Sequence, residues 1–296
     1  MPVIQTEVAL TLDNIVVATD FTPESEKALS YARALAHQFA TRITLAHVID
    51  LSAATPLPDA IVGLPLDKLR HDSAENIKRT LFDLGMEGVT AQGKTLEAHN
   101  PTSAIVDLSH KLDADLIIVG THARHGLSKL ILGSCSKGII HSARCPVLTI
   151  GPNADPDPVD LAFRSIVFAT DLKHDAVEKA SVALAFAKKT IANVRICHVI
   201  EDHAEFFADA FRQHARAEYA LARLIPEASY TWCSPKSSAL FGNVDREILR
   251  LARANQTDLI VLGAHRNSPF LSRFWDGVVE DVIRQAPCPV LTICTG

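Results

Sequence analysis

The chain has 296 residues, a length that suits two domains of roughly 150 residues each. It is 48% hydrophobic and 21% charged, as is typical of globular proteins, and its net charge of −5 without a basic stripe argues against a nucleic-acid partner. No apolar run approaches the roughly 20 residues that cross a bilayer, and residues 1–12 lack a signal-peptide pattern. We therefore expect a cytoplasmic protein with no membrane partner.

Predicted strands and helices alternate along the chain. The β-branched run at residues 15–20 predicts a buried strand, and Thr22 is expected to cap a helix that begins at Pro23. The apolar stripe of that helix consists of Ala28, Leu29, Ala32, Leu35, Ala36 and Phe39. Further buried strands are predicted at residues 47–50, 115–120 and 145–150. Because the strands are continuously apolar and alternate with helices, the pattern predicts a doubly wound parallel sheet of the α/β class.

The whole pattern occurs twice. Four blocks recur in the same order: 15–20 as 166–171, 47–50 as 198–201, 115–120 as 258–263, and 145–150 as 288–293. The offset is 171 − 20 = 151 for the first two blocks and 263 − 120 = 143 for the last two, so the register slips by eight residues, which we assign to residues 51–65. The helix of the second copy has a matching stripe at Val177, Ala180, Leu184, Ala187 and Ile191. We expect domains at 1–152 and 161–296, joined by a proline-rich linker at 151–160.

The segment after the strand at 115–120 has the features of an anion-binding cradle. Gly120 ends the strand, and Gly133 and Ser134 open a new helix that runs through His141. A helix start presents free backbone N–H groups and the positive end of the helix dipole, and Ser136 can add a hydroxyl donor. The alternative is structural: Gly120 would only permit a tight strand exit, and Ser134 would only cap its helix.

Four features together resemble the universal stress protein family: the strand that ends in Thr-Asp, the His-Val strand, the loop Gly120-x2-Ala123-x9-Gly133-Ser134, and the closing Cys-Pro-Val strand. The resemblance covers nearly the whole chain, twice, and implies Rossmann-like domains of the adenine-nucleotide α-hydrolase type. It also implies two subclasses, one that binds ATP, with or without Mg²⁺, and one that does not bind nucleotide. Ala123 departs from the second glycine of the family's loop, which would cost roughly 1 kcal/mol if that position needs a positive φ. The residues implied to bind the nucleotide are Ala18, Thr19, Asp20, Val48, Gly120, His122, Ala123, Arg124, Gly133, Ser134, Cys135 and Ser136.

The second copy departs further from that loop. Its four aligned positions are Gly263, Arg266, Asp276 and Gly277, and the Asp276 carboxylate would repel a phosphate. We expect a degenerate, structural copy. Because Asp171 is retained, a pocket of adenosine size without a triphosphate stays an alternative.

These observations favour a stress-response regulatory protein that binds ATP in its first copy, without dedicated catalysis and with protein partners that the sequence does not identify. The chain contains no P-loop, no kinase signature and no evident pair of nucleophile and base. Two alternatives stay open: a non-nucleotide-binding interaction module with vestigial sites, and a slow ATP hydrolase.

Three further expectations concern assembly and packing. Family members dimerise through their last strand, so the strands that end at Ile150 and Ile293 are expected to pair within the chain as a pseudo-dimer, and a homodimer of the chain stays open. His47 and His198 recur in equivalent strands and are expected to be packed and hydrogen-bonded. The aromatic group Phe206, Phe207 and Phe211 is expected in the core or in contacts between domains.

Overall fold

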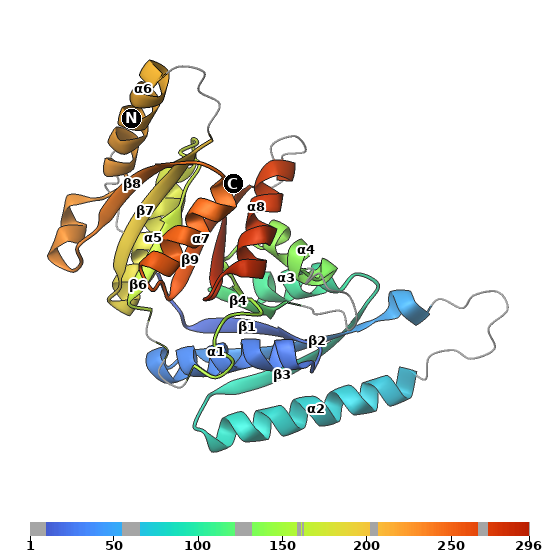
Figure 1. The fold of residues 1–296 in the computed structure, drawn as a ribbon. Coiled ribbons are helices and arrows are strands. Elements are labelled where there is room, and N and C mark those ends of the chain that lie inside the picture. Colours follow the sequence, from blue (N-terminus) through green and yellow to red (C-terminus); the bar gives the residue numbers. More distant parts are fainter. Residues whose placement is uncertain are drawn as a thin grey trace. The chain divides into compact units, whose positions relative to one another are not determined.

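The computed structural model describes residues 10–54, 66–121, 132–158, 161, 163–201, 207–265 and 272–295 (Figure 1). The chain divides into two units. The first copy is formed by Thr11–Ile150 together with Pro156–Leu161, and the second by Ala162–Gly296 together with Gly151–Asp155. None of the helices in the described residues combines the length and the apolar composition that a membrane span needs.

The first copy is a parallel sheet with helices on both faces. Its strands lie in the order β3-β2-β1-β4-β5, and every pairing is parallel. Helices α3 and α4 pack on each other, whereas α1 and α2 contact the sheet separately (Figure 1). The elements are β1 (Asn14–Thr19), α1 (Pro23–Phe39), β2 (Arg42–Asp50), the 3-10 helix η1 (Leu51–Ala54), α2 (Leu66–Met86), β3 (Ala91–Ala98), α3 (Pro101–Lys111), β4 (Leu116–Gly120), α4 (Ser134–Ser142) and β5 (Val147–Ile150).

The second copy repeats this topology. Its strands lie in the order β10-β9-β6-β7-β8, again with parallel pairings throughout. The prediction of two tandem doubly wound α/β domains is therefore confirmed. The elements are β6 (Ser165–Ala169), α5 (Ala176–Thr190), β7 (Asn193–Ile200), α6 (Phe207–Ala222), the 3-10 helix η2 (Glu227–Thr231), β8 (Lys236–Phe241), α7 (Val244–Ala254), β9 (Leu259–His265), α8 (Ser272–Gln285) and β10 (Val290–Thr295).

The predicted start of α1 is confirmed, and so is most of its predicted apolar stripe. Thr22 caps the helix by accepting a hydrogen bond from the N–H of Ser25, and Pro23 occupies the first turn. All stripe residues except Phe39, which is partly exposed, are buried.

In α5 the expectation for Ile191 is wrong: the residue is 81% exposed, because it ends the helix in the left-handed conformation. Phe211 is 76% exposed and so is not a core residue, while the side chains of Phe206 and Phe207 lie outside the described part of the chain.

The duplication extends to unusual backbone conformations. Among the described residues, six that are not glycine have positive φ, and they form three pairs at the offsets found in the sequence. Such conformations are uncommon outside glycine, so their pairing indicates that both copies preserve the same turns. The pairs are Phe21 and Leu172, Ala40 and Ile191, and Asp113 and Gln256.

Candidate nucleotide-binding site

A cavity of about 220 Å³ lies in the first copy, beyond the carboxyl ends of β1, β2 and β4. β1 has β2 on one side and β4 on the other, so the cavity lies where the strand order reverses, the usual ligand position in open parallel sheets. Other lining residues come from α1, α3 and α4, among them Ser25, Pro101 and Ile139, which the sequence did not single out for the site. The predicted residues that line it are Ala18, Thr19, Asp20, Val48, Gly120, Cys135 and Ser136.

The other predicted residues are placed differently. Gly133 and Ser134 lie at the start of α4, directly before the lining residue Cys135. His122, Ala123 and Arg124 lie outside the described residues, so their role and the effect of alanine at position 123 stay predictions.

The turn after β1 holds the Asp20 carboxylate beside the cavity. Thr22 donates two hydrogen bonds to Asp20 Oδ1, from its N–H at 3.1 Å and from its hydroxyl at 2.6 Å. The N–H of Phe21 donates to Thr19 Oγ1 at 3.0 Å, and Phe21 has a φ of 60°, which a bulky residue rarely adopts. The turn thus fixes the position of the carboxylate through its backbone.

Two carboxylates make this part of the site acidic. Burial raises the pKa of the Cys135 thiol, and the nearby charges of Asp20 and Asp50 raise it further. Ser52 donates from its hydroxyl at 2.6 Å and its N–H at 2.8 Å to Asp50 Oδ1, which lowers the pKa of Asp50. At neutral pH, Cys135 is therefore an uncharged thiol in the first turn of α4.

The start of α4 supplies the positive end of the site. Gly133 is the N-cap residue, with φ −59° and ψ 147°, and no side-chain cap bond is made there. Ser134 is the first helical residue, so the alternative that Ser134 caps the helix is wrong. The first N–H groups of a helix have no acceptor within the helix. In α4 these groups belong to residues from Ser134 onward, which include the lining residues Cys135 and Ser136. A ligand with hydroxyl donors near Asp20 and an anionic group near α4 would match both charges.

Gly120 is required by a close approach between backbones. A Cβ atom added there would lie 2.3 Å from the carbonyl oxygen of Glu24 and 3.1 Å from the N–H nitrogen of Ser25, both in the first turn of α1. The hydroxyl of Ser136 donates to the Gly120 carbonyl at 2.9 Å, which ties α4 to the end of β4. Gly120 is therefore needed for the contact between β4 and α1, and it also lines the cavity, so a structural role and a ligand-binding role are both compatible with it.

Gly120→Ala is accordingly expected to destabilise the first copy by about 1–3 kcal/mol, because the methyl group collides with backbone that cannot rotate away. Urea unfolding followed by circular dichroism measures the loss, and amide exchange in α1 and β4 locates it. The control is Gly85→Ala in α2, where an added Cβ meets nothing within 4 Å and about 0.5–1 kcal/mol of stabilisation is expected. Equal stability of Gly120→Ala and the parent would contradict the contact.

A lysine fills the corresponding end of the sheet in the second copy. Lys179 is 2% exposed, and its Nζ lies 2.7 Å from Asp175 Oδ2. A Cβ atom added at Gly263, the equivalent of Gly120, would lie 2.5 Å from Lys179 Cδ and 3.1 Å from its Nζ. At the offset of 151, the first copy has Ala28 in place of this lysine. Aligning the two helices would have revealed the difference, which our reading of the sequence missed.

The second copy also lacks a helix start at the cradle position. At the offset of 143, the first residue of α4 corresponds to Gly277, but α8 begins at Ser272, which is 277 − 272 = 5 residues earlier. Asp276 and Gly277 therefore lie within the helix, where backbone N–H groups are bonded to carbonyls four residues back. The exclusion of a phosphate by the charge of Asp276 stays a prediction, and the position of α8 gives a second reason to expect no phosphate there.

The recurring histidines serve the fold. His47 Nδ1 lies 2.8 Å from the carbonyl oxygen of Thr19, and His198 Nδ1 lies 2.8 Å from that of Thr170. The ring of His47 also packs against Phe21, with centroids 4.7 Å apart. The expectation of packed, hydrogen-bonded histidines is confirmed. Across the described residues, no group of three or more histidine, cysteine, aspartate or glutamate side chains is arranged to hold a metal ion.

Comparisons with known proteins agree with this architecture. A universal stress protein of Methanocaldococcus jannaschii is 31% identical over 46% of this chain and 80% of its own length, and a homologue of universal stress protein A from Coxiella burnetii is 31% identical over 46% and 94%. The crystal structure of a universal stress protein from Archaeoglobus fulgidus covers 96% of this chain and 99% of its own, with a TM-score of 0.72 and 21% identity. A functionally unknown protein from Pseudomonas aeruginosa covers 97% and 94%, with a TM-score of 0.64 and 18% identity. The model of the universal stress protein family matches residues 11–151 and again residues 162–293. The chain therefore belongs to the universal stress protein family and carries its domain twice.

Proposed function

We propose that the first copy binds ATP and that the protein acts as a cytoplasmic stress-response regulator whose partners read the nucleotide-bound state. The observation that supports this most is the cavity, which seven of the predicted nucleotide-binding residues line. Its volume of about 220 Å³ is below the roughly 300–1,000 Å³ of pockets for drug-sized ligands. The enclosed part therefore suits the nucleoside, and the polyphosphate would extend along the start of α4.

The charge distribution supports the same ligand. Ribose hydroxyls can donate hydrogen bonds to a carboxylate such as that of Asp20. A phosphate would be stabilised by the backbone N–H groups that follow Gly133. Mg²⁺ would accompany the triphosphate and reduce its repulsion from Asp20 and Asp50. The apolar lining residues Ala18 and Val48 would contact the adenine.

We infer that the second copy takes no nucleotide. Lys179 occupies the space beside Gly263, and α8 covers the position where α4 begins in the first copy. The protein would then carry a single ATP molecule. No part of this proposal includes dedicated catalysis. Pairing of the final strands as a pseudo-dimer, and a homodimer of the chain, stay predictions.

Isothermal titration of the purified full chain with ATP and Mg²⁺ tests the proposal. We expect a single ATP molecule per chain and weaker binding of CTP, whose smaller base fills the cavity less completely. Absence of binding would favour an interaction module with a vestigial site. Two molecules per chain would show that Lys179 does not close the second site, and release of phosphate during the titration would favour a slow hydrolase.

A further inference from the structure

Helices α3 and α4 meet at a contact that leaves no room for a side chain on α4. A Cβ atom added at Gly138 of α4 would lie 2.7 Å from both Cγ2 and Oγ1 of Thr102, in the first turn of α3, and 3.2 Å from its Cβ. These two threonine atoms occupy two of the three staggered positions on Cβ, so rotation leaves a heavy atom in at least one position that faces Gly138. The distance between the two helices at this point is therefore set by glycine on one side and threonine on the other.

The same contact reaches the part of α4 that borders the cavity. The Thr102 hydroxyl donates a long hydrogen bond, 3.5 Å, to the carbonyl oxygen of the lining residue Cys135. On the other side, Ser136 donates to the Gly120 carbonyl at 2.9 Å. Helix α4 has nine residues, and Gly138 is the fifth of them. The first half of the helix is thus held between α3 and the end of β4.

The second copy has no such contact. Helices α3 and α7 coincide at the offset of 143, which places Asp245 at the position of Thr102 and Asp281 at the position of Gly138. Two carboxylates brought as close together as the glycine and the threonine would repel each other. The copy that lacks a helix start at the cradle position therefore also lacks the residues that hold one in place.

We propose that Thr102 and Gly138 are positioning residues that set the place of the α4 start and thereby the affinity for the phosphates of a nucleotide. The inference rests on the proposed binding of ATP to the first copy. Backbone N–H groups are aimed only by the position of their helix, so a shift of α4 would move all of its free donors away from a phosphate. The residues proposed for the nucleoside, Ala18, Asp20 and Val48, follow β1 and β2 instead and do not depend on α4.

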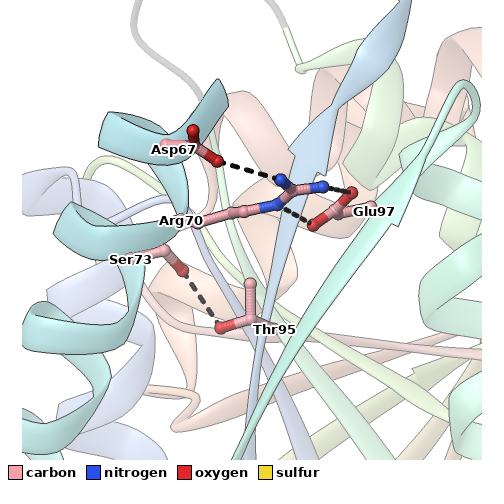
Figure 2. A network of polar contacts seen from close by, with 5 residues as sticks. All are labelled: Asp67, Arg70, Ser73, Thr95 and Glu97. Atoms are coloured by element: carbon pink, nitrogen blue, oxygen red, sulfur yellow. Dashed lines mark hydrogen bonds and ion pairs between the residues drawn. The ribbon is translucent and has the colours of Figure 1, made fainter. Parts of the chain in front are cut away.

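Helix α2 is attached to the sheet in a different way, which supplies a control. Arg70 donates to the two carboxylate oxygens of Glu97 in β3 at 2.7 and 2.9 Å and pairs with Asp67 at 3.1 Å, and Ser73 bonds Thr95 at 3.1 Å (Figure 2). None of the described residues of α2 or β3 lines the cavity. A change in this attachment should therefore leave nucleotide binding as it is.

Isothermal titration of the full chain with ATP and Mg²⁺, and separately with adenosine, tests the inference. Gly138→Ala should raise the Kd for ATP at least about tenfold, because the methyl group pushes α4 away from α3, and the Kd for adenosine by less than about threefold. Thr102→Ala removes both atoms that this methyl group would meet at 2.7 Å. The double variant Gly138→Ala/Thr102→Ala should therefore recover most of the affinity for ATP.

The matched control is Thr95→Val, which removes the bond to Ser73 in the same copy and should leave both Kd values within about twofold. Thermal unfolding checks that the variants are folded, as expected since alanine favours a helix more than glycine does. Gly138→Ala that binds ATP as the parent does, an equal loss of ATP and adenosine, or no recovery in the double variant would overturn the inference while the proposed function stands. A parent chain that binds no ATP would remove the proposed function, and this inference with it.

Discussion

Gly133→Asp is expected to abolish ATP binding while the protein stays as stable as the parent. Gly133 is the N-cap of α4 with φ −59°, a conformation open to any residue, and aspartate is among the best N-cap residues. Its carboxylate would accept hydrogen bonds from the first-turn N–H groups, the donors that we propose for phosphate. Like charges about 4 Å apart repel by about 4 kcal/mol near a protein surface, so the Kd should rise at least about 100-fold. Titration calorimetry measures the affinity, and thermal unfolding should show an unchanged or slightly higher Tm.

Two variants separate the reasons for that loss. Gly133→Asn keeps the size and the capping ability without the charge, so it should weaken ATP binding less than aspartate does. Gly85→Asp adds the same charge in α2, at an exposed position where an added Cβ meets nothing within 4 Å, and should leave the affinity unchanged. If Gly133→Asp binds ATP within twofold of the parent, the start of α4 does not hold the phosphates.

Local sequence patterns were enough to predict most of the fold. The cap at Thr22, the buried strands and the parallel direction of their pairing follow from residue periodicity and turn chemistry, which act over a few neighbours. The duplication follows from comparing the chain with itself. The same local logic fails at Ile191, where the helical period continues but the helix ends in a left-handed residue. It fails at Phe211 too, because hydrophobicity alone does not distinguish a core residue from one at an exposed surface.

The candidate site was harder to predict, because its features depend on contacts between distant segments. The need for glycine at position 120 arises from the backbone of Glu24, nearly a hundred residues earlier in the chain. The length of α8 decides whether Gly277 lies at a helix start, and element boundaries are the least certain part of a sequence-based prediction. Because the first copy has Ala28 at the equivalent position, the contact of Lys179 with Gly263 could have been suspected from the sequence. That Lys179 is buried could not.

Lys179→Ala is expected to destabilise the second copy by about 3–5 kcal/mol, because it leaves the Asp175 carboxylate without its buried cation and opens a void beside Gly263. Both tryptophans of the chain, Trp232 and Trp275, belong to the second copy. Urea unfolding followed by tryptophan fluorescence therefore reports on that copy alone. The midpoint should fall well below that of the parent, and Lys189→Ala, an exposed position on the same helix, should change the free energy of unfolding by no more than about 0.5 kcal/mol.

The double variant Lys179→Met/Asp175→Leu shows why the lysine is there. Replacing a buried ion pair by apolar residues of similar volume is often neutral or stabilising, so the double variant should recover most of the stability that Lys179→Ala loses. Nucleotide stoichiometry should stay at a single ATP per chain, because α8 still covers the position of Gly277. Binding of a second ATP by the double variant would mean that Lys179 alone closes this site, and that the second copy is a nucleotide site blocked by one side chain.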